Sequence, residues 1–126
     1  MHGMRILGAN ICKLMKEHDL IYAELADILG IDYWDMRGIC NGIVYMTGKD
    51  YSKLIKIFNC TTEDLFKKDF DTYNRYIFGG KLKSEDEIRI ADAILDQVEE
   101  LIKIEQARHI DREHESRKDD NERILE

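Results

Sequence analysis

The sequence of 126 residues contains no proline. Nothing therefore interrupts long helices, and no proline-rich linker divides the chain. No apolar run approaches the ~18 residues that a membrane-spanning helix needs, so we expect no membrane partner. The N-terminal residues also lack the continuous apolar block and small-residue cleavage site of a signal peptide.

Cysteine is scarce. Cys12, Cys40 and Cys60 are odd in number and far apart in the sequence. They form no CxxC pair and have no zinc-ligand spacing, which argues against a disulfide framework and a structural metal. We expect three reduced thiols in a cytoplasmic protein, with no cofactor.

Motifs for catalysis are also missing. The sequence has no Ser/His/Asp arrangement, no glycine-rich phosphate loop and no paired-acid motif, so we expect no catalytic residues and no enzyme activity. His109, Glu113 and His114 lie near one another in the sequence. They do not match HExxH, and a solvated helix face is the better interpretation than a metal site.

Negative charge is present but unevenly placed. The net charge is −7, which argues against strong nonspecific attraction to nucleic acid. Residues 1–70 hold nine Lys/Arg and ten Asp/Glu, whereas residues 71–126 hold ten and sixteen. The acidic excess therefore lies mainly in the C-terminal half, and the N-terminal half retains the capacity for a local basic face.

Hydrophobic periodicity predicts five helices in the N-terminal part. Gly30 and Gly42 are placed as helix terminators, and Asp32 is placed as an N-cap. Thr61 with Asp64 indicates another capped start. The expected helices cover residues 7–18, 22–29, 33–41, 49–59 and 62–68.

Residues 69–83 are the least regular part of the sequence. Tyr73, Tyr76 and Ile77 fit one helical turn that Gly79 and Gly80 would end. The β-forming residues in the same stretch leave a short strand as the alternative, and the helical turn is favoured.

A long C-terminal helix is predicted to begin at Ser84, which forms a capping-box pattern with Glu87. Its apolar stripe has coiled-coil-like spacing, and we expect it to pair two copies as a homodimer. Packing on the N-terminal domain is the alternative. Beyond residue 104 the stripe fades into a charged tail that is either a solvated helix or disordered. The candidate dimerisation residues are Ile88, Ala91, Leu95, Val98 and Ile102.

The most informative segment is residues 19–42, DLIYAELADILGIDYWDMRGICNG. A small Ala26 permits close crossing by a second helix, and Gly30 permits a backbone conformation that disfavours a Cβ atom. Apolar side chains, those of Ile31, Met36 and Ile39, then fill the wedge between the two helices. This arrangement is typical of a helix-turn-helix.

The segment resembles the Cro/cI-like helix-turn-helix family of phage repressors and related regulators. The resemblance covers residues 7–67 and includes Leu25-Ala26, Gly30-Ile31, Asn41-Gly42 and the closing LIKIFNCTTEDLF. It implies an all-α fold, a five-helix helix-turn-helix domain followed by a long C-terminal helix. The expected division is a domain over 1–69, a connector over 70–83, and a dimerisation arm with a charged tail over 84–126.

The resemblance also implies a function, a DNA-binding transcriptional regulator that acts as a dimer on double-stranded DNA. By position, Tyr33, Trp34 and Gly38 would face bases, and Tyr22 would contact a base or a phosphate. Arg37 is the cation of this helix, and Lys13 and Lys53 join Lys49 as expected phosphate neutralisers. The expected nucleic-acid-binding residues are Tyr22, Tyr33, Trp34, Arg37, Asn41, Thr47 and Lys49.

The predicted recognition helix departs from the family in chemistry. Good bidentate base readers are Arg, Lys, Asn and Gln, whereas Tyr33 and Trp34 offer one hydrogen bond each. Asp32 and Asp35 add negative charge where phosphates would approach. The alternative function is therefore a protein-interaction module of the antitoxin or anti-repressor type, which keeps the fold and binds a protein partner.

Overall fold

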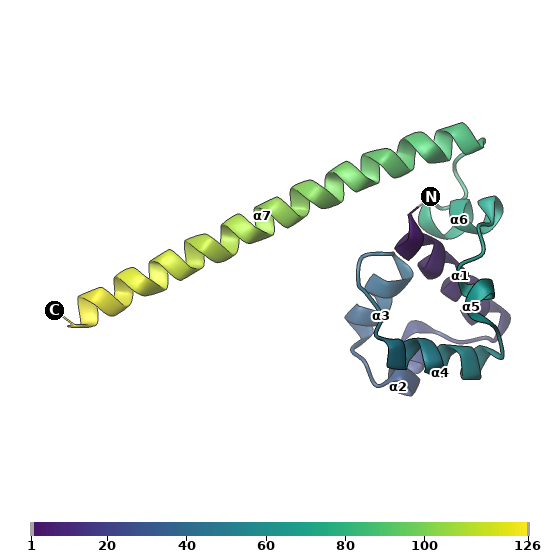
Figure 1. Ribbon diagram of the computed structural model, residues 1–126, viewed down its shortest axis with the longest axis horizontal. Helices are drawn as coiled ribbons and strands as arrows, with labels where there is room; N and C mark the ends of the chain where they lie inside the picture. The colour runs from purple at the N-terminus through teal and green to yellow at the C-terminus, as the bar shows by residue number, and fades with distance from the viewer. Residues whose placement is uncertain (1, 126) are drawn as a thin grey trace. The chain divides into compact units, whose positions relative to one another are not determined.

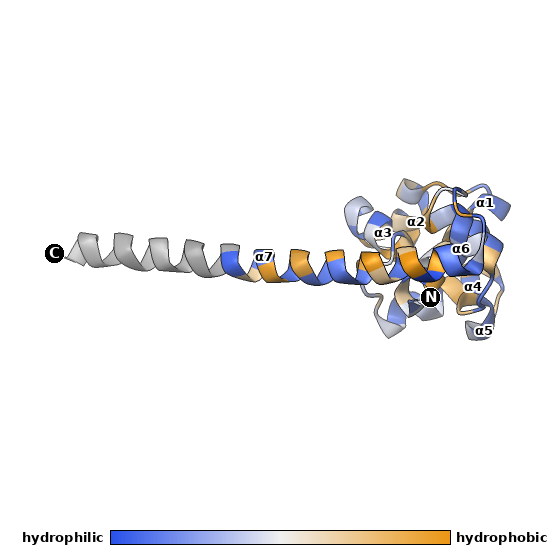
Figure 2. Cartoon of the chain, turned by 90° about the horizontal axis from the view of Figure 1, so that it is seen from above, coloured by the Kyte–Doolittle hydropathy of each residue, from blue (hydrophilic) through white to orange (hydrophobic). Residues whose placement is uncertain are grey.

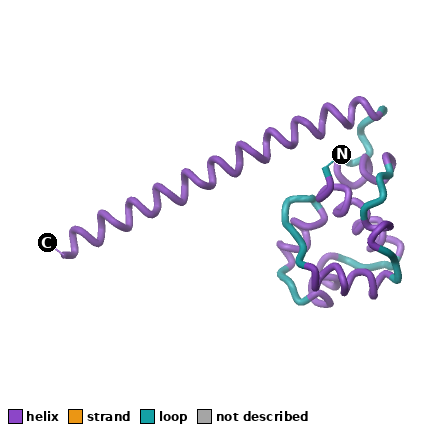
Figure 3. The backbone as a smooth tube through the Cα atoms, viewed as in Figure 1, coloured by secondary structure: helices purple, strands orange, loops and turns teal. Residues whose placement is uncertain are grey.

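The computed structural model describes the backbone of residues 2–125 and the side chains of residues 2–108. The described backbone contains seven α-helices and no strand (Figures 1 and 3). This confirms the predicted all-α class and the long C-terminal helix. It also resolves residues 69–83 in favour of a helix, which covers Phe70–Ile77. In chain order the helices are α1 (Gly3–Glu17), α2 (Tyr22–Leu29), α3 (Tyr33–Cys40), α4 (Gly48–Phe58), α5 (Thr62–Leu65), α6 (Phe70–Ile77) and α7 (Glu85–Leu125).

Side-chain caps fix where several helices begin. The first helix begins at Gly3 rather than at residue 7, because the His2 side chain accepts a hydrogen bond from the Met4 amide at 3.3 Å. The predicted Thr61–Asp64 capping box is present. The Thr61 amide donates to Asp64 at 2.9 Å, and the Asp64 amide donates to the Thr61 hydroxyl at 3.2 Å. Each bond satisfies an amide that has no partner within the helix.

The contacts divide the chain into two compact units, Met1–Arg89 and Ile90–Glu126. Residues 70–83, expected as a connector, form α6 and the following loop and belong to the first unit with residues 1–69. The core of this unit includes predicted inward side chains of α1, α2, α3 and α4. Its fully buried members are Ile11, Leu25, Met36, Cys40, Leu54 and Leu65. The apolar spacing of α2 also predicts Ile28 as inward, but its side chain is 47% exposed.

Helix α1 passes through the centre of the first unit and contacts α3, α5 and α6. The buried Asn10 side chain donates to the carbonyl oxygens of Leu65 and Lys67, at 2.7 and 3.0 Å, and so ties α1 to the end of α5. On the α3 side, a Cβ atom added to Gly8 would lie 2.4 Å from the carbonyl oxygen of Cys40. Gly8 therefore permits α1 and the end of α3 to approach at backbone contact.

A second apolar cluster joins α6 and the first turn of α7 to α1. It consists of Ile6, Tyr73 and Ile88, with partly buried neighbours from α6 and the following loop. The Asn74 side chain fixes that loop by donating to the Leu82 carbonyl at 2.6 Å and accepting from the Leu82 amide at 3.2 Å. The first turn of α7 therefore belongs to the N-terminal unit.

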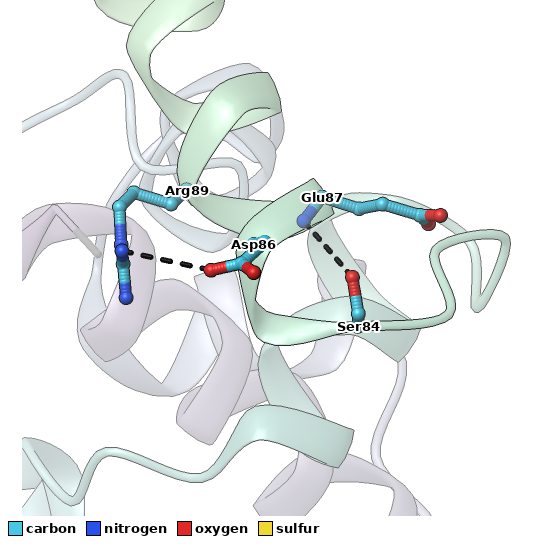
Figure 4. Close-up of polar contacts among 4 residues, drawn as sticks. All are labelled: Ser84, Asp86, Glu87 and Arg89. Carbon is cyan, nitrogen blue, oxygen red and sulfur yellow. Dashed lines mark hydrogen bonds and ion pairs between the residues drawn. The ribbon is translucent and has the colours of Figure 1, made fainter.

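The start of α7 is capped as the sequence predicts (Figure 4). The Glu87 amide donates to the Ser84 hydroxyl at 3.2 Å. The Glu87 carboxylate accepts from the Lys83 amide at 2.7 Å rather than from the amide of Ser84. Asp86 and Arg89 form an exposed ion pair at 3.6 Å, which adds little stability because solvent screens it.

Candidate functional site

Helix α3 has an inward and an outward face. Met36 is fully buried, and Ile39 and Cys40 lie beside it in the core. Trp34 is 67% exposed and Tyr33 is 39% exposed on the other side. Asp32 caps the helix by accepting from the Trp34 amide at 3.3 Å. The outward face is therefore held in place by packing and capping that do not use its own side chains.

The short turn between α2 and α3 sets the position of that face. Gly30 has a φ of 71°, in the left-handed region where a Cβ atom is strained. The Ile31 amide donates back to the Ala26 carbonyl at 3.0 Å, and Ile31 then packs against the core. The predicted use of Gly30 as a helix terminator is confirmed.

Three outward side chains of α3 contact one another, and we call Tyr33, Trp34 and Arg37 the aromatic–arginine cluster. The two rings meet edge to face, with centroids 5.3 Å apart. The guanidinium carbon of Arg37 lies 5.5 Å from the Trp34 ring centroid and 5.9 Å from that of Tyr33. Cation–π attraction of this kind restrains the arginine and keeps its positive charge beside exposed aromatic surface.

Tyr22 connects this cluster to the interior. Its ring meets that of Tyr33 edge to face at 6.3 Å, and its hydroxyl donates a hydrogen bond to Cys12. Burial and the neighbouring thiols raise the pKa of Tyr22 to about 12. The predicted contact residue is therefore half-buried, and its hydroxyl is already engaged within the protein.

The remaining predicted contact residues lie at helix ends. Asn41 is exposed at the C-terminal end of α3. The Thr47 hydroxyl caps α4, accepting from the Asp50 amide at 3.3 Å and donating to the Asp50 carboxylate at 3.0 Å. Lys49 is exposed in the first turn of the same helix. Thr47 therefore has a structural role that sequence reasoning did not assign to it.

Of the two further lysines expected to neutralise phosphate, Lys53 has a hydrogen-bond partner within the protein, whereas Lys13 is exposed on α1. The Lys53 ammonium donates to the Leu29 carbonyl at 3.1 Å and so satisfies the C-terminal end of α2. Lys13 lies near Asp69, whose pKa is lowered chiefly by a hydrogen bond from the Thr72 amide and in part by Lys13. Arg37 and Lys49 remain as the cations of the predicted contact set.

Gly38, expected by position to face a base, packs internally. A Cβ atom added there would lie 2.3 Å from a methyl carbon of Val44, and the Ile43 and Val44 amides both donate to the Gly38 carbonyl. Gly38 therefore gives the following loop room to close against α3. That loop presents Ile43 and Tyr45 to solvent, 65% and 78% exposed, and no periodic pattern in the sequence indicated this.

The five predicted dimerisation residues differ in how far they are buried. Ile88 is 2% exposed and packs with Ile6 and Tyr73 of the N-terminal unit, so it is not available to a second chain. Ala91 and Leu95 are half-buried, whereas Val98 and Ile102 are exposed. Figure 2 shows apolar residues recurring along the coloured part of α7. Further exposed apolar residues on α7 are Ile90, Ile94, Leu101 and Ile104.

Residues 2–108 contain no group of His, Cys, Asp and Glu side chains arranged to hold a metal ion. His109, Glu113 and His114, like the rest of the charged tail from Asp111, lie outside the described side chains. None of the described helices has both the length and the apolar content needed to cross a membrane.

The chain was compared with protein-family models, with curated proteins and with solved structures. None of these comparisons found a match.

Proposed function

We propose that this chain is a DNA-binding transcriptional regulator, and that α2 and α3 act as a helix-turn-helix with α3 in the major groove. The observation that carries the proposal is the outward face of α3, on which Tyr33, Trp34 and Arg37 are exposed while Met36 and Ile39 are buried. A helix supported from behind and exposed in front is what insertion into a groove requires.

The outward face supplies contacts of three kinds. The aromatic–arginine cluster offers one cation, two ring faces and single hydrogen-bond donors, which suit thymine methyl groups and guanine edges. Asn41, one turn beyond Arg37, adds an amide of the type that pairs with adenine. Lys49 at the start of α4 is placed to meet a phosphate, as exposed lysines near a helix N-terminus do.

The proposal includes a second copy of the chain. Apolar side chains of α7 are exposed to solvent, among them Ile94, Leu101 and Ile102. Pairing them with the same residues of another chain removes that apolar surface from water. A two-fold dimer would then present two α3 helices to half-sites about one helical turn of DNA apart.

The proposed DNA-binding face carries few positive charges. Arg37 and Lys49 are the cations of the contact set, and the Lys53 ammonium donates to the Leu29 carbonyl instead. With about 0.9 released counterions per neutralised phosphate, log affinity should fall with log salt with a slope of about 2 per protomer. This shallow dependence distinguishes the proposal from nonspecific binding through a large basic patch.

Titration of a fluorescent duplex library with the full-length protein tests the proposal. Wild type should bind a subset of sequences with saturation below about 10 μM at low salt and should bind the other sequences of the library more weakly. Arg37→Ala should weaken binding about tenfold and reduce the salt slope by about 1. Arg75→Ala is the charge-matched control, since Arg75 is exposed on α6. Equal losses in both variants, or no saturable binding by wild type, would overturn the proposal.

A protein-interaction module is the second candidate, and one observation favours it. Exposed apolar side chains, Ile43 and Tyr45, flank α3, and the exposed carboxylates of Asp32 and Asp35 lie at its start. Aromatic surface beside negative charge suits a basic protein partner better than phosphate. Capture of a protein from cell extract that Trp34→Ala abolishes, together with absent DNA binding, would select this candidate.

A further inference from the structure

Two sulfur atoms meet where α1 packs against the end of α3. The Cys40 thiol lies 3.9 Å from the Met15 sulfur, and Cys40 is fully buried. Gly8 brings the two helices to backbone contact at Cys40 itself, and Cys12 lies one helical turn after Gly8 on the same face of α1. Cys12 therefore lies on the face of α1 that packs against the core around Met15 and Cys40, although the two cysteines are 28 positions apart in the sequence.

The two thiols shift each other's pKa in opposite directions. The neighbouring Cys40 thiol lowers the pKa of Cys12 and the Tyr22 hydroxyl adds to this lowering, while burial opposes it. Cys12 and burial raise the pKa of Cys40. Of the two thiols, Cys12 therefore ionises more readily.

Access from solvent differs in the same direction. Cys12 is half-buried and lines a shallow surface depression of about 340 Å³, together with Lys16 and Tyr22. Cys40 is sealed in the core behind it. A small oxidant can therefore reach Cys12 first, whereas the buried Cys40 can react only with the oxidised side chain of Cys12.

We propose that Cys12 and Cys40 are a redox-active thiol pair, which a peroxide converts reversibly into a disulfide between α1 and the end of α3. The Cys12 thiolate attacks a peroxide oxygen, so that an S–O bond forms, the O–O bond breaks, and the departing hydroxide takes a proton to become water. The sulfur of Cys40 then attacks the Cys12 sulfenic acid. An S–S bond forms, the S–O bond breaks, and the Cys40 proton leaves with the hydroxide as a second water.

This inference is independent of the proposed function, because it concerns the interior of the N-terminal unit. It nevertheless has a consequence for the outward face. The acceptor of the Tyr22 hydroxyl is the Cys12 sulfur, and the Tyr22 ring contacts Tyr33 of the aromatic–arginine cluster. Oxidation changes the Cys12 sulfur beside the Tyr22 hydroxyl and so acts next to the cluster.

Peptide mapping tests the proposal on the full-length protein. After exposure to hydrogen peroxide and alkylation of remaining thiols, trypsin should release residues 6–13 linked to residues 38–49, since cleavage follows Arg5, Lys13, Arg37 and Lys49. A dithiol reductant should separate the two peptides. The amount of this linked peptide pair should exceed the amount of any linked pair that contains Cys60 by at least tenfold.

Cys60 provides the matched control. It is also half-buried, but burial and the nearby Asp64 raise its pKa. Cys60→Ser should leave the linked peptide unchanged, whereas Cys12→Ser should abolish it while circular dichroism shows an intact fold. Three outcomes would overturn the proposal. The first is linkage mainly through Cys60, and the second is accumulation of Cys12 sulfinic acid while Cys40 remains a free thiol. The third is that Cys12 and Cys40 both remain unmodified after Cys60 has reacted.

Discussion

The two faces of α3 differ in what holds their side chains. On the inner face, Met36 and Ile39 are packed by several helices and have almost no contact with water. On the outer face, Tyr33, Trp34 and Arg37 contact chiefly one another and Tyr22. Neighbouring positions in the sequence therefore face different environments.

Stability and binding are therefore separable on this helix. The inner face fixes where α3 lies, through core packing that single substitutions disturb strongly. The outer face contributes little to folding, because exposed contacts exchange readily for contacts with water. An outer-face substitution that strongly lowered the free energy of unfolding, or an inner-face substitution that left it unchanged, would contradict this division.

The largest effect is expected from a pair of adjacent residues. Met36→Ala should lower the free energy of unfolding by about 2–5 kcal/mol, because it leaves a cavity in the core. Arg37→Ala, one position later, should change it by less than about 0.5 kcal/mol. Urea unfolding of both variants measures the contrast. A loss of equal size at Arg37 would show that the outer face also supports the fold.

A glycine pair gives the next largest effect. Gly8→Ala places a Cβ atom 2.4 Å from the Cys40 carbonyl oxygen and 2.7 Å from that of Ile39. Backbone must shift, and overpacking of this kind costs about 1–3 kcal/mol. Gly3→Ala is the control, since nothing lies within 4 Å of a Cβ atom there. Thermal unfolding should therefore show a lower midpoint for the first variant only.

Much of the fold was predictable because local rules and burial agree. Helix periodicity located the inward residues Met36 and Ile39, and the cap at Ser84 marked the start of α7. Partners distant in sequence were not predictable. Asn10 binds the Leu65 carbonyl and Ile88 packs against Ile6, and neither pairing has a local pattern. The burial of Ile88 depends on α6, whose docking on α1 the sequence does not specify.

The candidate site was predictable in part for the same reason. Exposure of Trp34 follows from the helical period once Met36 is known to be buried, because residues two positions apart lie on opposite sides of a helix. Tyr33, three positions before Met36, lies nearer the buried side and is less exposed than Trp34. The Tyr22–Cys12 hydrogen bond and the contact of Lys53 with Leu29 depend on how three helices pack together. Hydrophobic periodicity says which face is inward, but it does not say which polar atoms meet there.

Tyr22 of α2 contacts Tyr33 on the outer face of α3 and Cys12 in the interior. Tyr22→Phe removes its hydrogen bond to Cys12 and should cost about 1 kcal/mol near neutral pH. The folded-state pKa of about 12 lies above the ordinary 10.0, so this contribution is present below pH 10 and is lost as the pH rises toward 12. The stability difference between wild type and variant should therefore shrink in alkaline urea titrations. A constant difference would place the hydroxyl in solvent.

The smallest effect is expected at Asp35, which is exposed in the first turn of α3. The effect of Asp35→Asn on binding should have opposite signs for DNA and for a basic protein. If phosphate approaches this face, Asp35→Asn removes a repulsive charge and should strengthen DNA binding about threefold at low salt. If a basic protein approaches it, the same substitution should weaken that complex by a similar factor. Asp71→Asn is the matched control, an exposed carboxylate in the first turn of α6, and should change neither complex. Because Asp35 favours the helix dipole by only a few tenths of a kcal/mol, any larger change in binding reports the charge of the partner rather than loss of the helix.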